Sequence, residues 1–132
     1  MKYIPTIAAA VLFSAPASFA DEDGHPELVG AVKTFHDVLK VDWHAEPGAE
    51  RNANACRNTG DYITHARNIT TQDSPDGAST DTWSATSYSL LDASIALGAY
   101  CLSANDANVE AGLSTLHDRF HDLMKLMKAK DQ

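Results

Sequence analysis

Histidine is the residue type whose number and spacing best suit chemistry in this sequence, with six in 132 residues. Neutral imidazole is the commonest metal-binding side chain. His117 and His121 stand four residues apart, so a helix over this segment places both imidazoles on adjacent turns of one face. This pair is the first candidate for a ligand set. His25, His44 and His65, which stand alone or near expected helix ends, are weaker candidates.

His36 is the candidate for a third metal ligand. If its helix runs antiparallel beside the helix of the pair, His36 comes level with the segment between His117 and His121. Asp37 and Asp118 would then add carboxylates nearby. Three imidazoles and a carboxylate can hold zinc, copper or nickel, so the sequence admits a divalent-metal site at these three histidines. The alternative, three solvated side chains on a helical surface, stays open.

Composition and charge exclude several other functions. The formal net charge is −8, which argues against nucleic-acid binding, because that needs clustered Lys and Arg against the phosphates. Seven Gly and two Cys suit neither collagen-like nor cysteine-dense scaffolds. No serine lies in a Gly-x-Ser-x-Gly elbow, and no other nucleophile constellation emerges. We therefore expect a binding protein and not an enzyme.

The start of the sequence has the pattern of a secretory signal peptide. A lysine at the second position is followed by a short apolar run at 7–13 and a small-residue cleavage site at 17–20. No later segment approaches the ~20 apolar residues that span a bilayer, and no lipid-bearing cysteine follows the cleavage site, so no membrane anchor is expected. We expect a signal peptide at 1–20 and one domain at 21–132, exported to a bacterial periplasm.

The expected export indicates the chemical state of the two cysteines. In an oxidising compartment, a single pair in a small domain is most simply one disulfide, here between Cys56 and Cys101. Closing that span would stabilise the fold by about 4 kcal/mol through the entropy of the unfolded chain. A metal-binding thiol pair and two buried free thiols are the alternatives.

Four segments have helical hydrophobic periodicity, and no segment alternates as a strand would. The first opens at the helix-start signal of residues 24–27, the second runs from 49 to about 70, the third covers about 82–103 and the fourth about 106–127. The fourth has the most regular apolar seam, which comprises Val109, Leu113, Leu116, Phe120, Leu123 and Met127. Four helices of ~20 residues with short connections predict an all-α, antiparallel up-down-up-down four-helix bundle.

The third segment carries two apolar stripes, about 120° apart around the helix. The first consists of Trp83, Leu90, Leu97 and Cys101. The second consists of Tyr88, Leu91, Ile95 and Leu102. So wide an apolar surface predicts that this helix contacts two neighbours.

The first helix resembles that of cytochrome b562, a periplasmic four-helix haem protein, over residues 34–41 (TFHDVLKV). The Ser-Pro-Asp loop at 74–76 is also similar. In that family, a Met near the start of the first helix and a His late in the fourth ligate the haem iron. The Met position falls here on Val32. The His position falls on Met127 without gaps, or with a six-residue gap on His121, which follows an aromatic residue as the family's His does.

Residues 113–120 (LSTLHDRF) are similar in spacing to the C-x-x-C-H motif of cytochromes c′, which share the bundle. Leu113 and Leu116 stand where that motif has its cysteines, so covalent attachment is excluded, whereas His117 could ligate a non-covalent haem. Together the resemblances imply haem b held through His117 or His121, for electron transfer or haem carriage with a periplasmic redox partner.

Three functions are therefore compatible with the sequence. The first, implied by the resemblance, is a haem-binding protein of the cytochrome b562 kind. The second is a haem-free bundle that binds a divalent metal ion at His36, His117 and His121 and serves a metal-handling partner. The third is a bundle without a cofactor that binds another protein.

Overall fold

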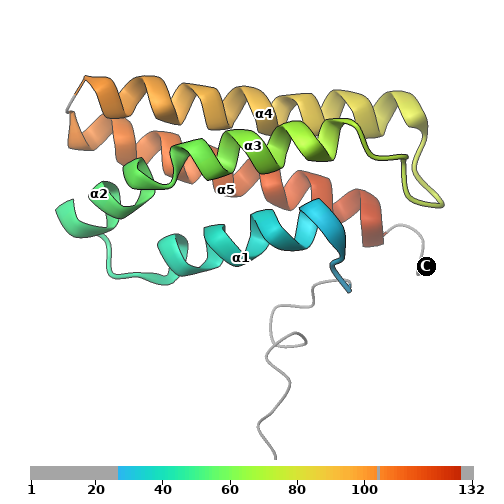
Figure 1. Ribbon diagram of the computed structural model, residues 1–132, viewed down its shortest axis with the longest axis horizontal. Helices are drawn as coiled ribbons and strands as arrows, with labels where there is room; N and C mark the ends of the chain where they lie inside the picture. Colours follow the sequence, from blue (N-terminus) through green and yellow to red (C-terminus); the bar gives the residue numbers. More distant parts are fainter. Residues whose placement is uncertain (1–26, 104, 129–132) are drawn as a thin grey trace, which may run out of the picture.

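The computed structural model describes residues 27–103 and 105–128, which form five α-helices and no β-strand (Figure 1). The prediction of an all-helical chain is confirmed. None of the described helices is long and apolar enough to cross a membrane. The expected signal peptide at 1–20 lies outside the described residues. The helices are α1 (Gly30–His44), α2 (Ala49–Arg57), α3 (Thr59–Thr70), α4 (Thr80–Leu102) and α5 (Asp106–Lys128).

The second predicted helix is wrong as a single element, because Asn58 divides it into α2 and α3. The Asn58 backbone has φ −95° and ψ 1°, and its amide donates to the carbonyls of Asn54 and Ala55 in a closing turn. Its side-chain amide donates to the buried carboxylate of Asp42 at 2.9 Å. Asn is a weak helix former that readily hydrogen-bonds outside the helix, so the helix is interrupted where this contact forms.

Most other helix boundaries lie close to the predicted ones. Ser79 caps the start of α4. Asn105 precedes α5, and its side chain accepts a hydrogen bond from the backbone amide of Asn108 at 3.1 Å. The exception is α1, which begins at Gly30. Gly30 has φ +60°, a left-handed conformation that favours glycine, and Glu27 from the predicted start signal lies outside the helix.

The core is built from buried side chains of all five helices. Phe35 of α1 and Phe120 of α5 stack with ring centroids 5.2 Å apart, and Tyr62 of α3 lies 5.3 Å from Phe35. These rings join three helices at the centre of the molecule. The other large apolar side chains of the core are Val32, Leu39, Ile69, Trp83, Leu90, Leu97, Val109, Leu113, Leu116, Leu123 and Met124.

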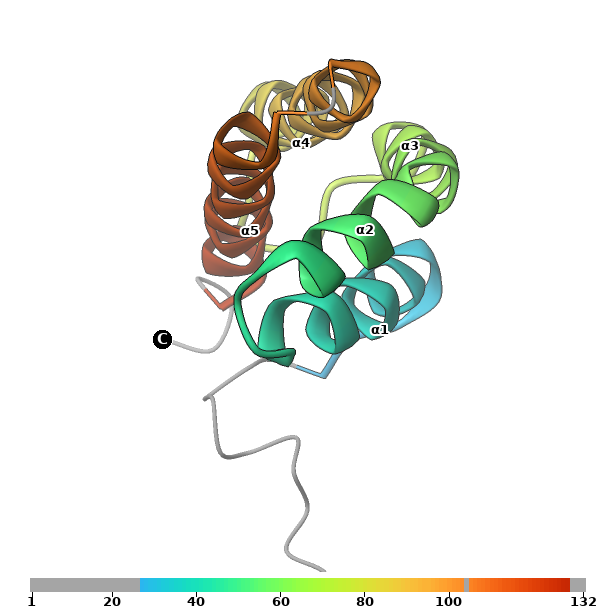
Figure 2. The same cartoon turned by 90° about the vertical axis from the view of Figure 1, so that its left-hand side faces the viewer.

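The helices pack in neighbouring pairs along the length of the molecule. α4 packs against both α3 and α5, α1 packs against α3, and α2 contacts α1 and α5 at one end (Figures 1 and 2). The two neighbours expected for α4 are present. Of its second stripe, Leu91 packs against the core, whereas Tyr88, Ile95 and Leu102 are 52%, 47% and 90% exposed.

A disulfide ties α2 to α4. The Sγ atoms of Cys56 and Cys101 lie 2.06 Å apart, and their Cα atoms lie 5.6 Å apart, within the range that disulfides need. Both cysteines lie at the end of their helix, so the bond fastens the last turn of α2 to the last turn of α4.

Candidate functional site

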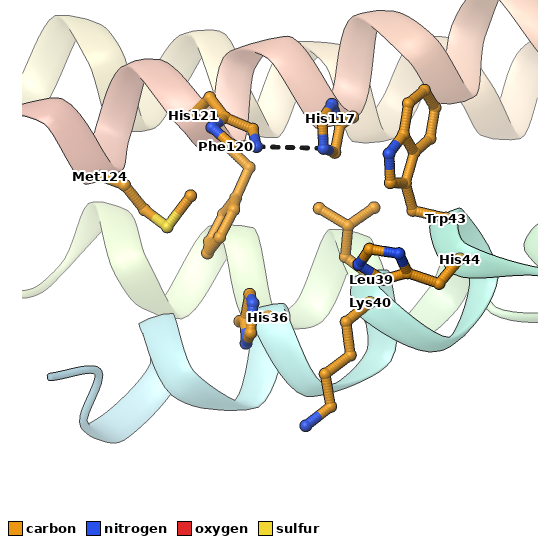
Figure 3. A pocket seen from close by; sticks show the side chains of 9 residues that line it. All are labelled: His36, Leu39, Lys40, Trp43, His44, His117, Phe120, His121 and Met124. Carbon is orange, nitrogen blue, oxygen red and sulfur yellow. Dashed lines mark hydrogen bonds between the residues drawn. The ribbon is translucent and has the colours of Figure 1, made fainter. Parts of the chain in front are cut away.

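A cavity of about 280 Å³ lies between α1 and α5 (Figure 3). Each helix forms one wall, and four of the six histidines line the space. His44 is one of them, although the sequence ranked it as a weak candidate. The lining residues are His36, Leu39, Lys40, Trp43 and His44 from α1 and His117, Phe120, His121 and Met124 from α5.

Helical spacing explains why these side chains share one cavity. On α5, His117, His121 and Met124 follow one another in steps of four and three, which keeps them on one face. The fully buried Leu116 directly precedes His117 in the chain, so His117 lies at the edge of the core-facing stripe. The imidazoles are consequently half-buried, between the apolar interior and the solvent.

His117 and His121 are in direct contact, as their spacing predicts. Their Nε2 atoms lie 3.0 Å apart, and the rings are tilted at 60° with centroids 4.3 Å apart. At this separation the Nε2–H of one ring donates a hydrogen bond to the lone pair of the other Nε2, and the tautomer decides which ring is the donor. A metal ion can take the place of that shared proton.

A column of stacked groups holds the ring of His117. Trp43 of α1 lies parallel to it, with centroids 4.0 Å apart and an interplanar angle of 11°. The guanidinium of Arg51 lies 4.9 Å from the centre of the Trp43 ring, and it also donates to the Trp43 carbonyl at 3.1 Å. Arg51 is 5% exposed and forms an ion pair with Glu110 of α5. Sequence reasoning missed both Trp43 and Arg51, although Trp43 stands seven residues after His36 and shares its helix face.

His36 does not join the pair in a compact ligand set. Its ring stacks on Phe120, with centroids 5.7 Å apart. Across residues 27–103 and 105–128, no three or more His, Cys, Asp or Glu side chains are grouped so as to hold a metal ion. His36 and His44 instead line the wall opposite the pair, with Leu39 between them (Figure 3).

Of the two carboxylates expected near the histidines, Asp118 lies close to His117, whereas Asp37 is paired with lysines. Asp37 forms ion pairs with Lys33 and Lys40, and the hydrogen bond from Lys33 holds the pKa of the Asp37 carboxyl below its usual value. Asp118 is exposed, and its Oδ1 lies 3.9 Å from Nδ1 of His117. Asp118 can therefore attract a protonated His117 but is not aimed into the cavity, since it does not line it.

The buried carboxylate of Asp42 anchors the end of α1. Asp42, which is 2% exposed and precedes Trp43, accepts hydrogen bonds from the phenol of Tyr62 and from the side-chain amide of Asn58. Burial raises the pKa of Tyr62, and the bond to Asp42 raises it further. The last turn of α1 is thereby fixed to the junction of α2 and α3.

At about 280 Å³, the cavity is small for a haem. Pockets for drug-sized ligands start at roughly 300 Å³, and a porphyrin with its propionates needs more than that minimum. The position of the family's Met ligand is Val32, which is buried in the core and has no ligand atom. The residues present do not fit a haem held in the manner of cytochrome b562.

Comparisons of the chain with protein-family models, curated proteins and solved structures find no match. The function is therefore argued from the geometry of the cavity.

Proposed function

We propose that this protein binds a transition-metal ion at the His117–His121 pair and is a binding protein, not an enzyme. The observation that carries the proposal is the 3.0 Å separation of the two Nε2 atoms at the wall of the cavity. Two imidazole nitrogens on one helix face are a recurrent ligand pair for Zn²⁺, Cu²⁺ and Ni²⁺.

The separation of the two nitrogens lets them share one ion. An ion lying 2.0–2.1 Å from each nitrogen, as imidazole ligands require, would subtend an angle of about 94° at a 3.0 Å separation. This angle lies between the square-planar and tetrahedral values. The stack of His117 on Trp43 limits rotation of that ring, so part of the ordering that binding requires is already present in the fold.

We further propose that the helices form an exported, antiparallel four-helix bundle in which α2 and α3 together take the place of the second helix. The signal-peptide pattern and the disulfide support export, because disulfides persist in oxidising compartments. The packing of α4 on α3 and α5, and of α1 on α3, supports the bundle.

The test is a metal titration that uses Trp43 as the reporter. The sequence has two tryptophans, so the Trp83→Phe variant leaves Trp43, in van der Waals contact with His117, as the single fluorophore. We expect one Cu²⁺ or Ni²⁺ per chain to quench its emission, and equilibrium dialysis with metal analysis to give the same stoichiometry. His117→Ala and His121→Ala should each weaken binding more than about tenfold, since each removes one of two ligands.

The matched control is His65→Ala on α3, because His65 is half-buried but does not line the cavity. Its affinity should equal that of the parent protein. Equal affinities in all three histidine variants would refute the site. A haem titration in parallel tests the rival function. A Soret shift that His121→Ala abolishes would show that the protein binds haem and not a metal ion.

A further inference from the structure

Met124 brings a third potential ligand to the same cavity. It lies three residues after His121 on α5, and its side chain lines the cavity with the pair. Figure 3 shows its sulfur directed from α5 toward the α1 wall, beside Phe120. Met124 is 3% exposed, so its thioether is held inside the protein and is shielded from bulk solvent.

The donor set of the cavity is soft and uncharged. None of the nine lining side chains is a carboxylate, the ligand type that Mg²⁺, Ca²⁺ and Mn²⁺ prefer. The lining offers imidazole nitrogens and one thioether, and thioether sulfur selects copper in its cuprous state. Cupric ion in turn binds nitrogen ligands more tightly than the other divalent ions of the first transition series.

The charge of the bound ion also favours copper. Neutral ligands leave the full charge of a bound ion uncompensated, and Lys40 at the rim adds a positive charge. Burying charge in a partly apolar site is costly, and the cost rises steeply with the charge of the ion. A monovalent ion therefore suits this lining better than a divalent one, and Cu⁺ is the monovalent ion that imidazole and thioether both ligate.

We propose that the metal is copper and that Sδ of Met124 completes the His117–His121 pair as the ligand that retains the cuprous state. This inference rests on the proposed function, because it takes the histidine pair as the metal site. His117, His121 and Met124 then form a ligand triad from one face of a single helix, closed on the far side by Trp43, Leu39 and His36 of α1.

The experiment compares Met124→Leu with Met127→Leu in the folded, disulfide-bonded protein. Leucine conserves most of the volume of methionine but has no donor atom. Met127 is the matched control, because it is half-buried on the same helix and does not line the cavity. Cu⁺ affinity is measured without oxygen, with ascorbate as the reductant and a chromogenic cuprous chelator as the competitor. Ni²⁺ affinity is measured by Trp43 quenching.

We expect Met124→Leu to weaken Cu⁺ binding at least about tenfold while Ni²⁺ binding changes less than about twofold, and Met127→Leu to change neither. X-ray absorption of the cuprous protein should show a copper–sulfur path that Met124→Leu removes. Unchanged Cu⁺ affinity and no sulfur path would overturn the role of Met124 and leave the histidine pair intact. Absence of any metal binding to the parent protein would instead reject the proposed function.

Discussion

At the scale of single residues, the most unusual group is a carboxylate inside the core. Asp42 is 2% exposed, and its oxygens accept hydrogen bonds from Tyr62 and Asn58. A buried carboxylate is tolerated only where its lone pairs are satisfied. These bonds connect the end of α1 with the point where the chain passes from α2 to α3.

Removing one partner of Asp42 should destabilise the protein measurably. Tyr62→Phe deletes the phenolic donor with almost no change in shape, so the carboxylate loses a hydrogen bond while staying buried. We expect the free energy of unfolding to fall by about 1–3 kcal/mol in urea titrations. Tyr88→Phe, at a phenol that is 52% exposed, should change it by less than about 0.5 kcal/mol. Equal losses in the two variants would contradict this account of Asp42.

The sequence was informative about residues that act within one helix and poor for residues that meet across helices. The contact of His117 with His121 follows from a spacing of four. The stack of Arg51 on Trp43 and of Trp43 on His117 joins α2, α1 and α5, so it depends on how these helices are placed. The spacing places Met124 on the same face as His121, but whether its thioether lines a cavity depends on where α1 lies.

At the scale of elements, α2 depends on contacts from outside itself. It has nine residues, and an isolated helix of that length is unstable in water. Arg51 fastens its first half to Trp43 and Glu110, and Cys56 fastens its end to Cys101. Tertiary contacts, and not the propensity of an asparagine-rich segment, therefore hold α2 in place.

Removing the disulfide should act mainly on α2. In the Cys56→Ala/Cys101→Ala variant, the free energy of unfolding should fall by about 4 kcal/mol, because a span of 45 residues is no longer closed in the unfolded chain. Native-state hydrogen exchange should show the largest loss of protection in α2 and little change in the middle of α5. A uniform loss across all helices would show that the bond stabilises the fold without anchoring α2 in particular.

Periodicity identified the elements better than it identified their interruptions. Five of the six residues in the predicted seam of α5 are buried: Val109, Leu113, Leu116, Phe120 and Leu123. The sixth, Met127, is half-buried, and Met124 is the methionine that is buried. The break at Asn58 was missed because it depends on Asp42, a residue sixteen positions earlier that is brought close only by folding. Periodicity also does not show which side of α4 its neighbours cover, and most of the second apolar stripe is exposed.

At the scale of the whole molecule, the expected export can be tested directly. In the periplasmic fraction of a Gram-negative host, intact-mass measurement should find a chain that begins at Asp21, because cleavage after Ala20 suits the small-residue rule. Ala20→Tyr should block processing and leave the precursor. Recovery of the unprocessed parent chain from the cytoplasmic fraction would contradict the proposed location.

The buried side chain of Arg51 links the two helices that form the walls of the cavity. It reaches from Trp43 on one wall of the cavity to Glu110 on the helix that forms the other wall, and it is 5% exposed. The side chain therefore works as a spacer that sets the distance between α1 and α5 near His117. A change in the spacing of α1 and α5 at this end of the cavity would break the ion pair or the cation–π contact. The spacing of the two walls is thus held from α2, a helix that contributes no residue to the lining of the cavity.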